Sequence, residues 1–512
     1  MITQNQKTYT FAVLSALCMS LAWFFPGTKL CAALGWAAAL ALIPALDNPK
    51  HFYRPLYLCG VITNALGFYW LYETIHSFGG FPYYGAAAVF LLFVLLSAVQ
   101  YLIFAFCFRN LPQFLDAAAV RAGIAWVVAE VISVRLFPWY AGHTQLGLVE
   151  LAQLASLGGA LLISLLIFWV AEAFWILLRQ HGRMGIPWLA PAALALAYYY
   201  GFSLAAGSVN SAAAPQKVAL VQANITSEER NNTRFFRNNT QRYLDLTAEL
   251  AAQNSNLLII WPESSFQVFV PTNIQSAEEY SGLPYYGRGH AMLIGTLSFD
   301  PALSKPKQLT VYNSAMAISA DGTIPALYHK QILMPFGEFM PLASWIPGLK
   351  ELNPNVGDFS AGKELRVYEI ETGQRYLKAA PLICYEDMVP ELAREATLKG
   401  AEILINLTND SWFGNTIALH QHHVIASFRA IENRRYLLRS TNTGLTAVVN
   451  PLGQTLGALP PFSEGILYSE VVPNSVTTLF TQVGNKPWWA LVLIAACLIG
   501  LGKAINRNSR RL

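Results

Sequence analysis

One cysteine stands out among the residues that could do chemistry. Cys384 ends the apolar part of the stretch AAPLICYED (residues 379–387), which reads as a buried strand, and Tyr385 and Glu386 follow it directly. The remaining cysteines of the chain, Cys18, Cys31, Cys59, Cys107 and Cys497, lie in long apolar segments, where a thiol behaves as a small apolar side chain. Counting alone leaves two interpretations of Cys384 open, an inert buried residue or a nucleophile.

A cysteine nucleophile needs a base or a neighbouring positive charge, because the thiolate is the attacking form. One possible partner is a histidine of the cluster 420–423 (HQHH), which also raises the question of metal binding. No Cys-x-x-Cys pair accompanies the cluster and its spacing is not the i, i+4 pair of a zinc helix, so we expect no metal and interpret it as an interfacial helix start.

The other possible partners are a carboxylate and a lysine. Glu263 ends an apolar strand, and Lys330 stands just before a loop. Strand ends are where the sites of α/β sheets gather. Taken alone, each of the two residues is more often an ordinary surface charge than a catalytic one.

Composition indicates where this chemistry takes place. Of the 512 residues, 54% are hydrophobic and only 12% are charged, about half the usual charged share of roughly 25%. This deficit predicts a membrane protein. The net charge of +4 is small and no basic stripe is present, which excludes nucleic acid as a partner.

Apolar residues fall into two blocks on either side of a mixed one. This pattern predicts a membrane domain over residues 1–206, a globular domain over 207–485, and a last span with a basic tail over 486–512. Eight segments approach the ~20 apolar residues that cross a bilayer: 9–26, 29–46, 56–73, 84–107, 115–133, 152–178, 186–206 and 487–504. The first lacks a small-residue cleavage site and the next span follows at once, so we interpret it as a span and not as a signal peptide.

Basic residues predict the orientation of these spans. Lys7, Lys50, Arg109, Arg179 and the arginines of the tail 507–511 share one side if the N-terminus is cytoplasmic. The positive-inside rule then puts both termini in the cytoplasm and the globular domain outside. In a bacterium with two membranes, this is an inner-membrane protein whose globular domain faces the periplasm.

The membrane block contains charged and aromatic residues of interest. Charges within spans are often functional, but for Glu130 and Arg135 we favour pairing with each other or with loops near the outer interface. Glu172 is a further charge inside a span. The aromatic and glycine-rich loops 76–84 and 137–143 are either interfacial belts or a lipid-facing mouth.

The globular block alternates apolar runs with helical patterns, which indicates an α/β domain. We expect strands at 217–223, 257–260, 291–298, 311–319, 376–384, 402–406, 446–450 and 465–471, and helices at 242–252, 389–398 and 417–436.

Three separated motifs, Trp261-Pro262-Glu263, His329-Lys330 and Cys384-Tyr385-Glu386, together resemble the nitrilase (carbon–nitrogen hydrolase) superfamily. The resemblance implies a Glu-Lys-Cys triad on an αββα sandwich. The segments 335–339 (PFGEF), 409–414 (NDSWFG) and 438–444 (LRSTNTG), with the spans, narrow the resemblance to the apolipoprotein N-acyltransferase family.

That resemblance implies roles for single residues. Glu263 would be the general base, Cys384 the nucleophile, and Lys330 a stabiliser of the oxyanion. Glu338, Tyr385 and Glu386 would support them, and Asn409 and Trp412 match a loop implicated in substrate contact. The simpler interpretation of Glu386 is a helix N-terminal carboxylate, and that of Trp412 is a packing aromatic.

The implied reaction is a ping-pong acyl transfer without a cofactor. A phospholipid would acylate Cys384 as a thioester, and the α-amino group of a diacylated apolipoprotein would take up the acyl chain. One departure is the segment 224–230, which lacks the family's Pro and Trp, and for which Phe235 and Phe236 are possible substitutes. The loop at 137–139 also looks slightly shorter than usual.

Two other functions stay open on the sequence. A membrane-tethered amidase or nitrilase would use the same triad with water as the acceptor, although eight spans exceed what a tether needs. A transporter or assembly protein would use its outer domain only for binding, and would keep its activity without the Cys384 thiol.

Overall fold

The computed structural model describes residues 3–48, 51–179, 186–206, 213–279, 283, 285, 289–305, 309–341, 343, 345, 357–373 and 375–508. They form two compact units. The first comprises Met1–Tyr72, Tyr83–Ser208 and Gln482–Leu512, and the second comprises Glu73–Pro82 and Val209–Thr481. Lys50 and the tail residues Arg510 and Arg511, which entered the orientation prediction, lie outside the described residues.

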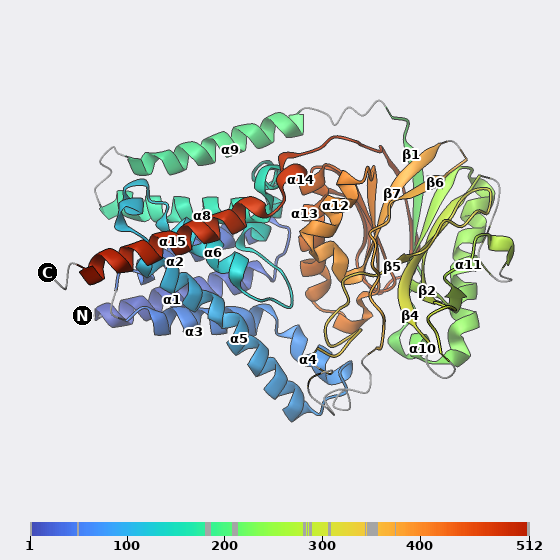
Figure 1. Cartoon of the computed structure of the whole chain (residues 1–512), viewed down its shortest axis with the longest axis horizontal. Helices are drawn as coiled ribbons and strands as arrows, with labels where there is room; N and C mark the ends of the chain where they lie inside the picture. Colours follow the sequence, from blue (N-terminus) through green and yellow to red (C-terminus); the bar gives the residue numbers. More distant parts are fainter. Residues whose placement is uncertain are drawn as a thin grey trace. The chain divides into compact units, whose positions relative to one another are not determined.

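The first unit is a bundle of helices (Figure 1). Leucines of α5 such as Leu91, Leu92 and Leu96 point outward and are exposed, a contiguous apolar surface that water-soluble proteins avoid. Trp488 of the last helix packs with Val127 and Leu161, so the C-terminal helix belongs to the same bundle. Its helices are α1 (Gln4–Ala22), α2 (Lys29–Ala45), α3 (Tyr53–Gly67), α5 (Tyr83–Asn110), α6 (Arg121–Ile132), α7 (Val149–Ala152), α8 (Ala155–Arg179), α9 (Leu189–Ala206) and α15 (Lys486–Asn508). A further helix, α4 (Trp70–Ser77), begins in the first unit and ends in the second.

Helices occupy each of the segments for which spans are predicted, but not all at spanning length. Within the described residues, α5, α8 and α15 (as far as Lys503) are long and apolar enough to cross a membrane, and α2 and α9 are shorter apolar helices. The segment 115–133 differs from expectation, because a 3-10 turn (Gln113–Ala118) precedes α6. Ala119 ends that turn with a positive φ of 56°. The protein is therefore a membrane protein with several apolar helices.

In the first unit, backbone groups pair with the buried carboxylates of Glu130 and Glu172 and with the half-buried Arg135. For Glu130 and Arg135, pairing with a loop was one of the favoured alternatives. Glu130 accepts a hydrogen bond from the Ala141 N–H at 2.8 Å, and Arg135 donates to the Trp139 carbonyl at 2.7 Å. Both partners lie in the aromatic segment 137–143. Glu172 accepts from the N–H of Ala122 at 2.7 Å, at the start of α6.

The second unit is a sandwich of two six-stranded sheets, ordered β12-β1-β2-β3-β4-β5 and β11-β10-β9-β8-β7-β6. Neighbours β1, β2 and β3 are parallel, as are β7, β8 and β9. The strands are β1 (Gln216–Gln222), β2 (Leu257–Pro271), β3 (Ala291–Phe299), β4 (Val311–Ile318), β5 (Tyr328–His329), β6 (Tyr368–Glu371), β7 (Tyr376–Ile383), β8 (Ile403–Thr408), β9 (Tyr436–Thr441), β10 (Thr446–Val449), β11 (Thr455–Leu459) and β12 (Gly465–Val471).

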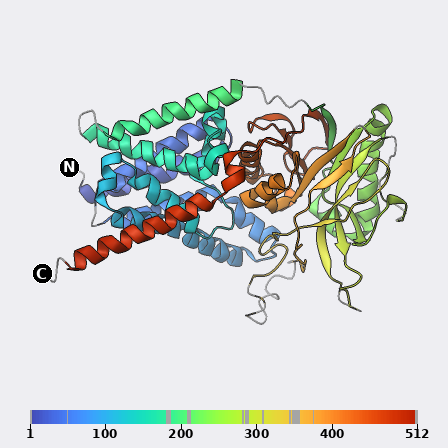
Figure 2. The same cartoon turned by 45° about the horizontal axis from the view of Figure 1, so that its top comes forward.

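Helices cover both outer faces of the sandwich, α11 (Phe236–Gln253) on the first sheet and α12 (Pro390–Leu398) and α13 (Ala418–Asn433) on the second (Figure 1, Figure 2). Alternation within each strand sends one set of side chains between the sheets and the other under the helices. On β2, Leu258 and Ile260 enter the central core while Leu257 and Ile259 pack with Tyr243 of α11. The four-layer α/β sandwich is confirmed. The strand predicted at 257–260 extends to Pro271, and four strands were not predicted: β5, β6, β9 and β11.

Candidate active site

The predicted nucleophile and base both sit at irregular points of otherwise regular strands. Cys384 follows β7 directly and has a φ of +51°, and Ser264, next to Glu263, has a φ of +50°. A positive φ is unfavourable for residues with a Cβ and gathers at functional sites. The pairing of β2 with β3 shifts register between Trp261 and Phe266. Gly295 is required opposite this shift, because a Cβ there would lie 2.6 Å from the Glu263 Cα.

Lys330 follows β5 and is buried between two carboxylates. Its Nζ lies 2.7 Å from Glu338 Oε2 and 3.7 Å from Glu263 Oε1. The side-chain amide of Asn313, on β4, donates to Glu263 at 2.7 Å and to Glu338 at 2.8 Å. The backbone N–H of Asn409 donates to the second oxygen of Glu263 at 2.9 Å. The orientation of Glu263 is therefore fixed from three sides.

These charges act on the thiol of Cys384. The residue keeps part of its surface accessible, yet its surroundings are dense, and desolvation raises the pKa of the thiol well above its ordinary value. The negative charge of Glu263 raises this pKa further, and Lys330 opposes it. Desolvation lowers the pKa of Lys330. The negative charges around it, that of Glu338 first and that of Glu263 among the others, outweigh this effect and raise the pKa, so the amine stays protonated. At rest the site holds a neutral thiol beside a charged lysine.

Glu386 fixes the backbone around the site. Its carboxylate accepts hydrogen bonds from the Tyr328 hydroxyl at 2.9 Å, from the backbone of Gln331 at 2.6 Å and Ile332 at 3.1 Å, and from Ile383 at 2.7 Å. It thereby ties the strand before Cys384 to the segment after Lys330. Burial raises the pKa of Glu386 to about 7.

The remaining predicted residues lie around this centre. Tyr385 follows Cys384 and is half-buried. The amide of Asn409 accepts a hydrogen bond from Asn442 Nδ2 at 3.1 Å. The Trp412 ring lies 4.0 Å from that of Phe78 and packs on Gly337, where a Cβ would lie 3.3 Å from the indole. Phe78 belongs to the aromatic segment 76–84, so this segment contributes to the cover of the site within the second unit.

Sequence reasoning missed several residues of the site. Asn313 bridges the two carboxylates but looks like any asparagine in a strand. The segment 224–230 is held through Asn442, which accepts from the N–H of Ile225 at 2.9 Å. The histidine cluster does stand at a helix start, but the interfacial interpretation is wrong for His422 and His423, because both are buried in α13.

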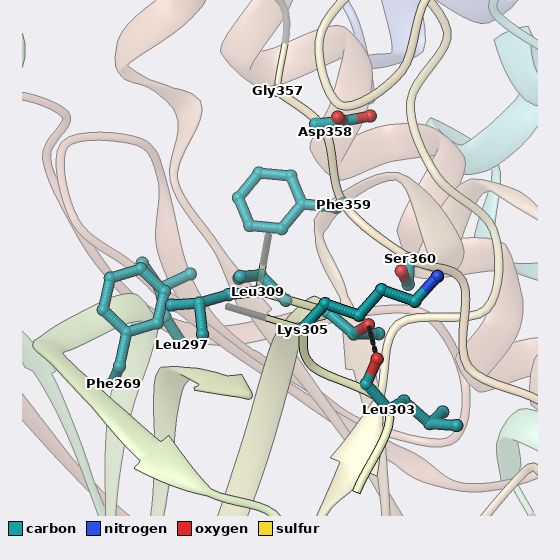
Figure 3. A pocket seen from close by; sticks show the side chains of 11 residues that line it. Phe269, Leu297, Leu303, Lys305, Leu309, Gly357, Asp358, Phe359 and Ser360 are labelled. Atoms are coloured by element: carbon teal, nitrogen blue, oxygen red, sulfur yellow. Dashed lines mark hydrogen bonds between the residues drawn. The ribbon is translucent and has the colours of Figure 1, made fainter. Parts of the chain in front are cut away.

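A pocket of about 570 Å³ lies at the end of β2, β3 and β4 (Figure 3). Phe269 and Leu297 line one side, and Lys305 and Ser360 line the other. Its wall is joined to the Glu338 loop, because the N–H of Gly357 donates to the Gly337 carbonyl at 2.9 Å. Polar and apolar atoms share the walls of the pocket about equally, with Leu303 and Phe359 among the apolar residues and Lys305 and Asp358 among the charged ones.

Residues 217–479, more than half of the chain, match the Carbon-nitrogen hydrolase family, so the chain belongs to this family. Among solved structures, the chain is similar to Saccharomyces cerevisiae Nit3 of the nitrilase superfamily, with 21% identity and a TM-score of 0.39 over 52% of this chain and 93% of that one.

Residues 15–173 match a second family, Apolipoprotein N-acyltransferase N-terminal domain. Apolipoprotein N-acyltransferases similar to the whole chain include that of Geobacter metallireducens, 28% identical over 98% of this chain and 96% of the relative. That of Pseudomonas syringae is 30% identical over 95% and 98%, and that of Azotobacter vinelandii is 32% identical over 87% and 85%. The chain belongs to the apolipoprotein N-acyltransferase family, which confirms the resemblance drawn from its motifs.

Proposed function

We propose that the chain transfers an acyl chain from a phospholipid to the α-amino group of the N-terminal diacylglyceryl-cysteine of apolipoproteins. The observation that carries this proposal is the buried arrangement of Glu263, Lys330, Glu338 and Asn313 around the thiol of Cys384. Full-length similarity to apolipoprotein N-acyltransferases supports the nature of the acceptor.

In the first half-reaction the neutral thiol needs a base, because its pKa is raised. Glu263 takes the thiol proton as the sulfur attacks the ester carbonyl of the phospholipid, and a carbon–sulfur bond forms. The carbon–oxygen bond then breaks. Glu263 returns the proton to the departing oxygen, and lysophospholipid leaves a thioester on Cys384.

In the second half-reaction the amine of the apolipoprotein attacks the thioester carbonyl. A carbon–nitrogen bond forms, the amine gives a proton to Glu263, and the carbon–sulfur bond breaks. Glu263 then reprotonates the thiolate of Cys384. The oxyanion of each half-reaction is stabilised by Lys330, whose charge is held in place by Glu338 at 2.7 Å before the substrate arrives.

The lipid character of the donor is supported by two features outside the triad. The first unit has apolar outward faces, and the pocket of Figure 3, joined to the Glu338 loop, combines apolar side chains such as Phe269 and Leu297 with charged ones such as Lys305, as an acyl chain with a polar head group requires. We extend the proposal to eight spans in residues 1–206 and 486–512, with the catalytic domain 207–485 in the periplasm and both termini in the cytoplasm. The basic residues of the connecting loops support this inner-membrane orientation.

Intact-mass measurement tests the first half-reaction. Purified protein mixed with phospholipid vesicles should gain the mass of one acyl chain, and Cys384→Ser should gain none. Addition of a diacylated lipopeptide should remove the added mass and yield a triacylated peptide. Discharge to water alone, with free fatty acid as the product, would instead identify a hydrolase. A cell-based complementation that Cys384→Ser still supports would identify a binding or transport function.

A further inference from the structure

The histidine cluster of α13 reaches a group of charges that the proposed reaction does not use. His422 lies between two carboxylates, with Nε2 2.8 Å from Asp387 Oδ1 and Nδ1 3.0 Å from Asp410 Oδ1. Arg439, on β9, contacts the same pair through Asp387 Oδ2 and through Asp410 Oδ2 at 3.5 Å. All four residues are buried. Two cations therefore face two anions inside the protein.

The geometry requires a charged histidine. A neutral imidazole has one N–H, so it can donate to one carboxylate and must turn a lone pair toward the other. Here both ring nitrogens of His422 are at hydrogen-bonding distance from carboxylate oxygens. Desolvation lowers the pKa of His422, but the charges of Asp387 and Asp410 outweigh it and raise the pKa to about 9. The group as a whole is then neutral.

The position of this group links it to the nucleophile. Asp387 lies in the turn that Cys384 begins (Cys384–Met388), and Asp410 begins the turn Asp410–Phe413, directly after Asn409. The Thr408 hydroxyl lies 3.4 Å from Asp410 Oδ1 and also makes a hydrogen bond with the Cys384 side chain. The charge of Asp410 opposes ionisation of that thiol. Without a compensating positive charge, Asp410 would add to the repulsion that Glu263 exerts on the thiolate of Cys384.

We propose that Asp387, Asp410, His422 and Arg439 form a charge-balanced positioning unit that joins the Cys384 turn to the Asn409 loop and neutralises Asp410, so that the thiolate can form. The proposal rests on the proposed function of Cys384 as the nucleophile. The charged groups that face the thiol are then Glu263, Lys330 and Asp410, and those that face His422 are Asp387, Asp410 and Arg439.

The test measures ionisation of Cys384 without acyl transfer. Full-length protein in detergent is alkylated with iodoacetamide from pH 6 to pH 8, where His422 is charged, and the rate of modification of the Cys384 peptide is followed by mass spectrometry. Because the pKa of the thiol lies well above this range, the rate is proportional to the small thiolate fraction. His422→Gln removes one positive charge and should raise the pKa of the thiol by about one unit, which lowers the alkylation rate about tenfold. His423→Gln is the matched control, because His423 is buried on the same helix, its pKa is lowered to about 3, and it is uncharged.

A second variant separates charge from packing. Asp387→Asn combined with His422→Gln restores neutrality and should return the alkylation rate to the wild-type value. An unchanged rate in His422→Gln, or an equal loss in His423→Gln, would overturn the proposal. If His422→Gln does not fold, Arg439→Lys and Arg439→Gln repeat the comparison, and the loss of rate is expected only for Gln. If the alkylation rates follow this pattern but Cys384 takes up no acyl chain from phospholipid, the proposed function fails and the charge balance stands.

Discussion

Glu338 should control the strength of the base although it does not touch the thiol. Lys330 lies 2.7 Å from Glu338 and 3.7 Å from Glu263, so the two carboxylates compete for one amine. In Glu338→Gln the charge that holds the amine is lost. Glu338 accepts from Asn313 through one oxygen and from the N–H of Met334 through the other, each at 2.8 Å. The glutamine amide places its NH2 at one of these two positions, so one of the two hydrogen bonds is lost. Lys330 should therefore move toward Glu263.

The magnitude follows from the distances. With an effective dielectric constant of about 20, two unit charges attract by about 4.5 kcal/mol at 3.7 Å and by about 6 kcal/mol at a hydrogen-bonding distance of about 2.8 Å. The difference, about 1.5 kcal/mol, stabilises the charged form of Glu263 and makes it a weaker proton acceptor. We expect acyl-enzyme formation to fall about tenfold, with further loss from the displaced oxyanion donor.

Single-turnover acylation by phospholipid, followed by intact mass, measures this effect. Glu369→Gln is the matched control, because Glu369 makes an exposed ion pair with Lys378 at 3.4 Å in the same unit, and such pairs contribute little. Glu338→Gln that acylates at the wild-type rate would show that Glu338 does not hold Lys330 away from Glu263. The reasoning would also be refuted if Glu369→Gln slowed acylation equally.

Three further outcomes are expected. Asn313→Ala, which leaves two buried carboxylates without their shared donor, should slow acyl-enzyme formation at least tenfold, and Asn313→Asp should slow it more; equal rates would remove Asn313 from the site. The raised pKa of His422, about 9, contributes stability that is complete below about pH 6.5 and is lost as the pH rises through 9, by at most about 3 kcal/mol. Thermal unfolding from pH 6 to pH 10 should show this slope in wild type and in His423→Gln but not in His422→Gln, and parallel slopes would contradict it. Leu309→Trp, which narrows the pocket of Figure 3, should slow acylation by long-chain phospholipid several-fold more than acylation by a short-chain ester, whereas equal slowing would exclude the pocket as a chain site.

The sequence could predict those strands and helices whose positions depend on residues that are neighbours in the chain. Buried strands are continuous apolar runs in parallel sheets, which is why β1, β7 and β8 were found. The strand β2 was cut short because its register shift at Glu263 breaks the apolar pattern. The segment 115–133 was predicted as one helix because hydropathy does not register the turn that ends at Ala119.

The catalytic candidates could be predicted for a different reason, since Cys384 was the one thiol outside the apolar segments and the motifs around it were specific. The contacts of Asn313 could not be predicted, because they depend on the folded position of β4, which brings Asn313 close to both Glu263 and Glu338. The same holds for His422, whose partners Asp387 and Asp410 are distant in sequence and are brought together only by the ends of β7 and β8. The spacing of the histidines in the sequence does not indicate that Asp387 and Asp410 are their partners.

The site must keep the Cys384 thiol protonated at rest and still allow the thiolate to form during the reaction. The raised pKa of Cys384 meets the first requirement, and the neutralisation of Asp410 meets the second. A resting thiolate is prone to oxidation, and burial beside Glu263 opposes its formation by raising the pKa of the thiol. The proposed acylation nevertheless requires the thiolate at the moment of attack, which a further negative charge nearby would disfavour. In the proposed reaction Glu263 is the base, so its charge cannot be neutralised without loss of that role. Asp410 has no such duty, and it is Asp410 that Arg439 and His422 neutralise.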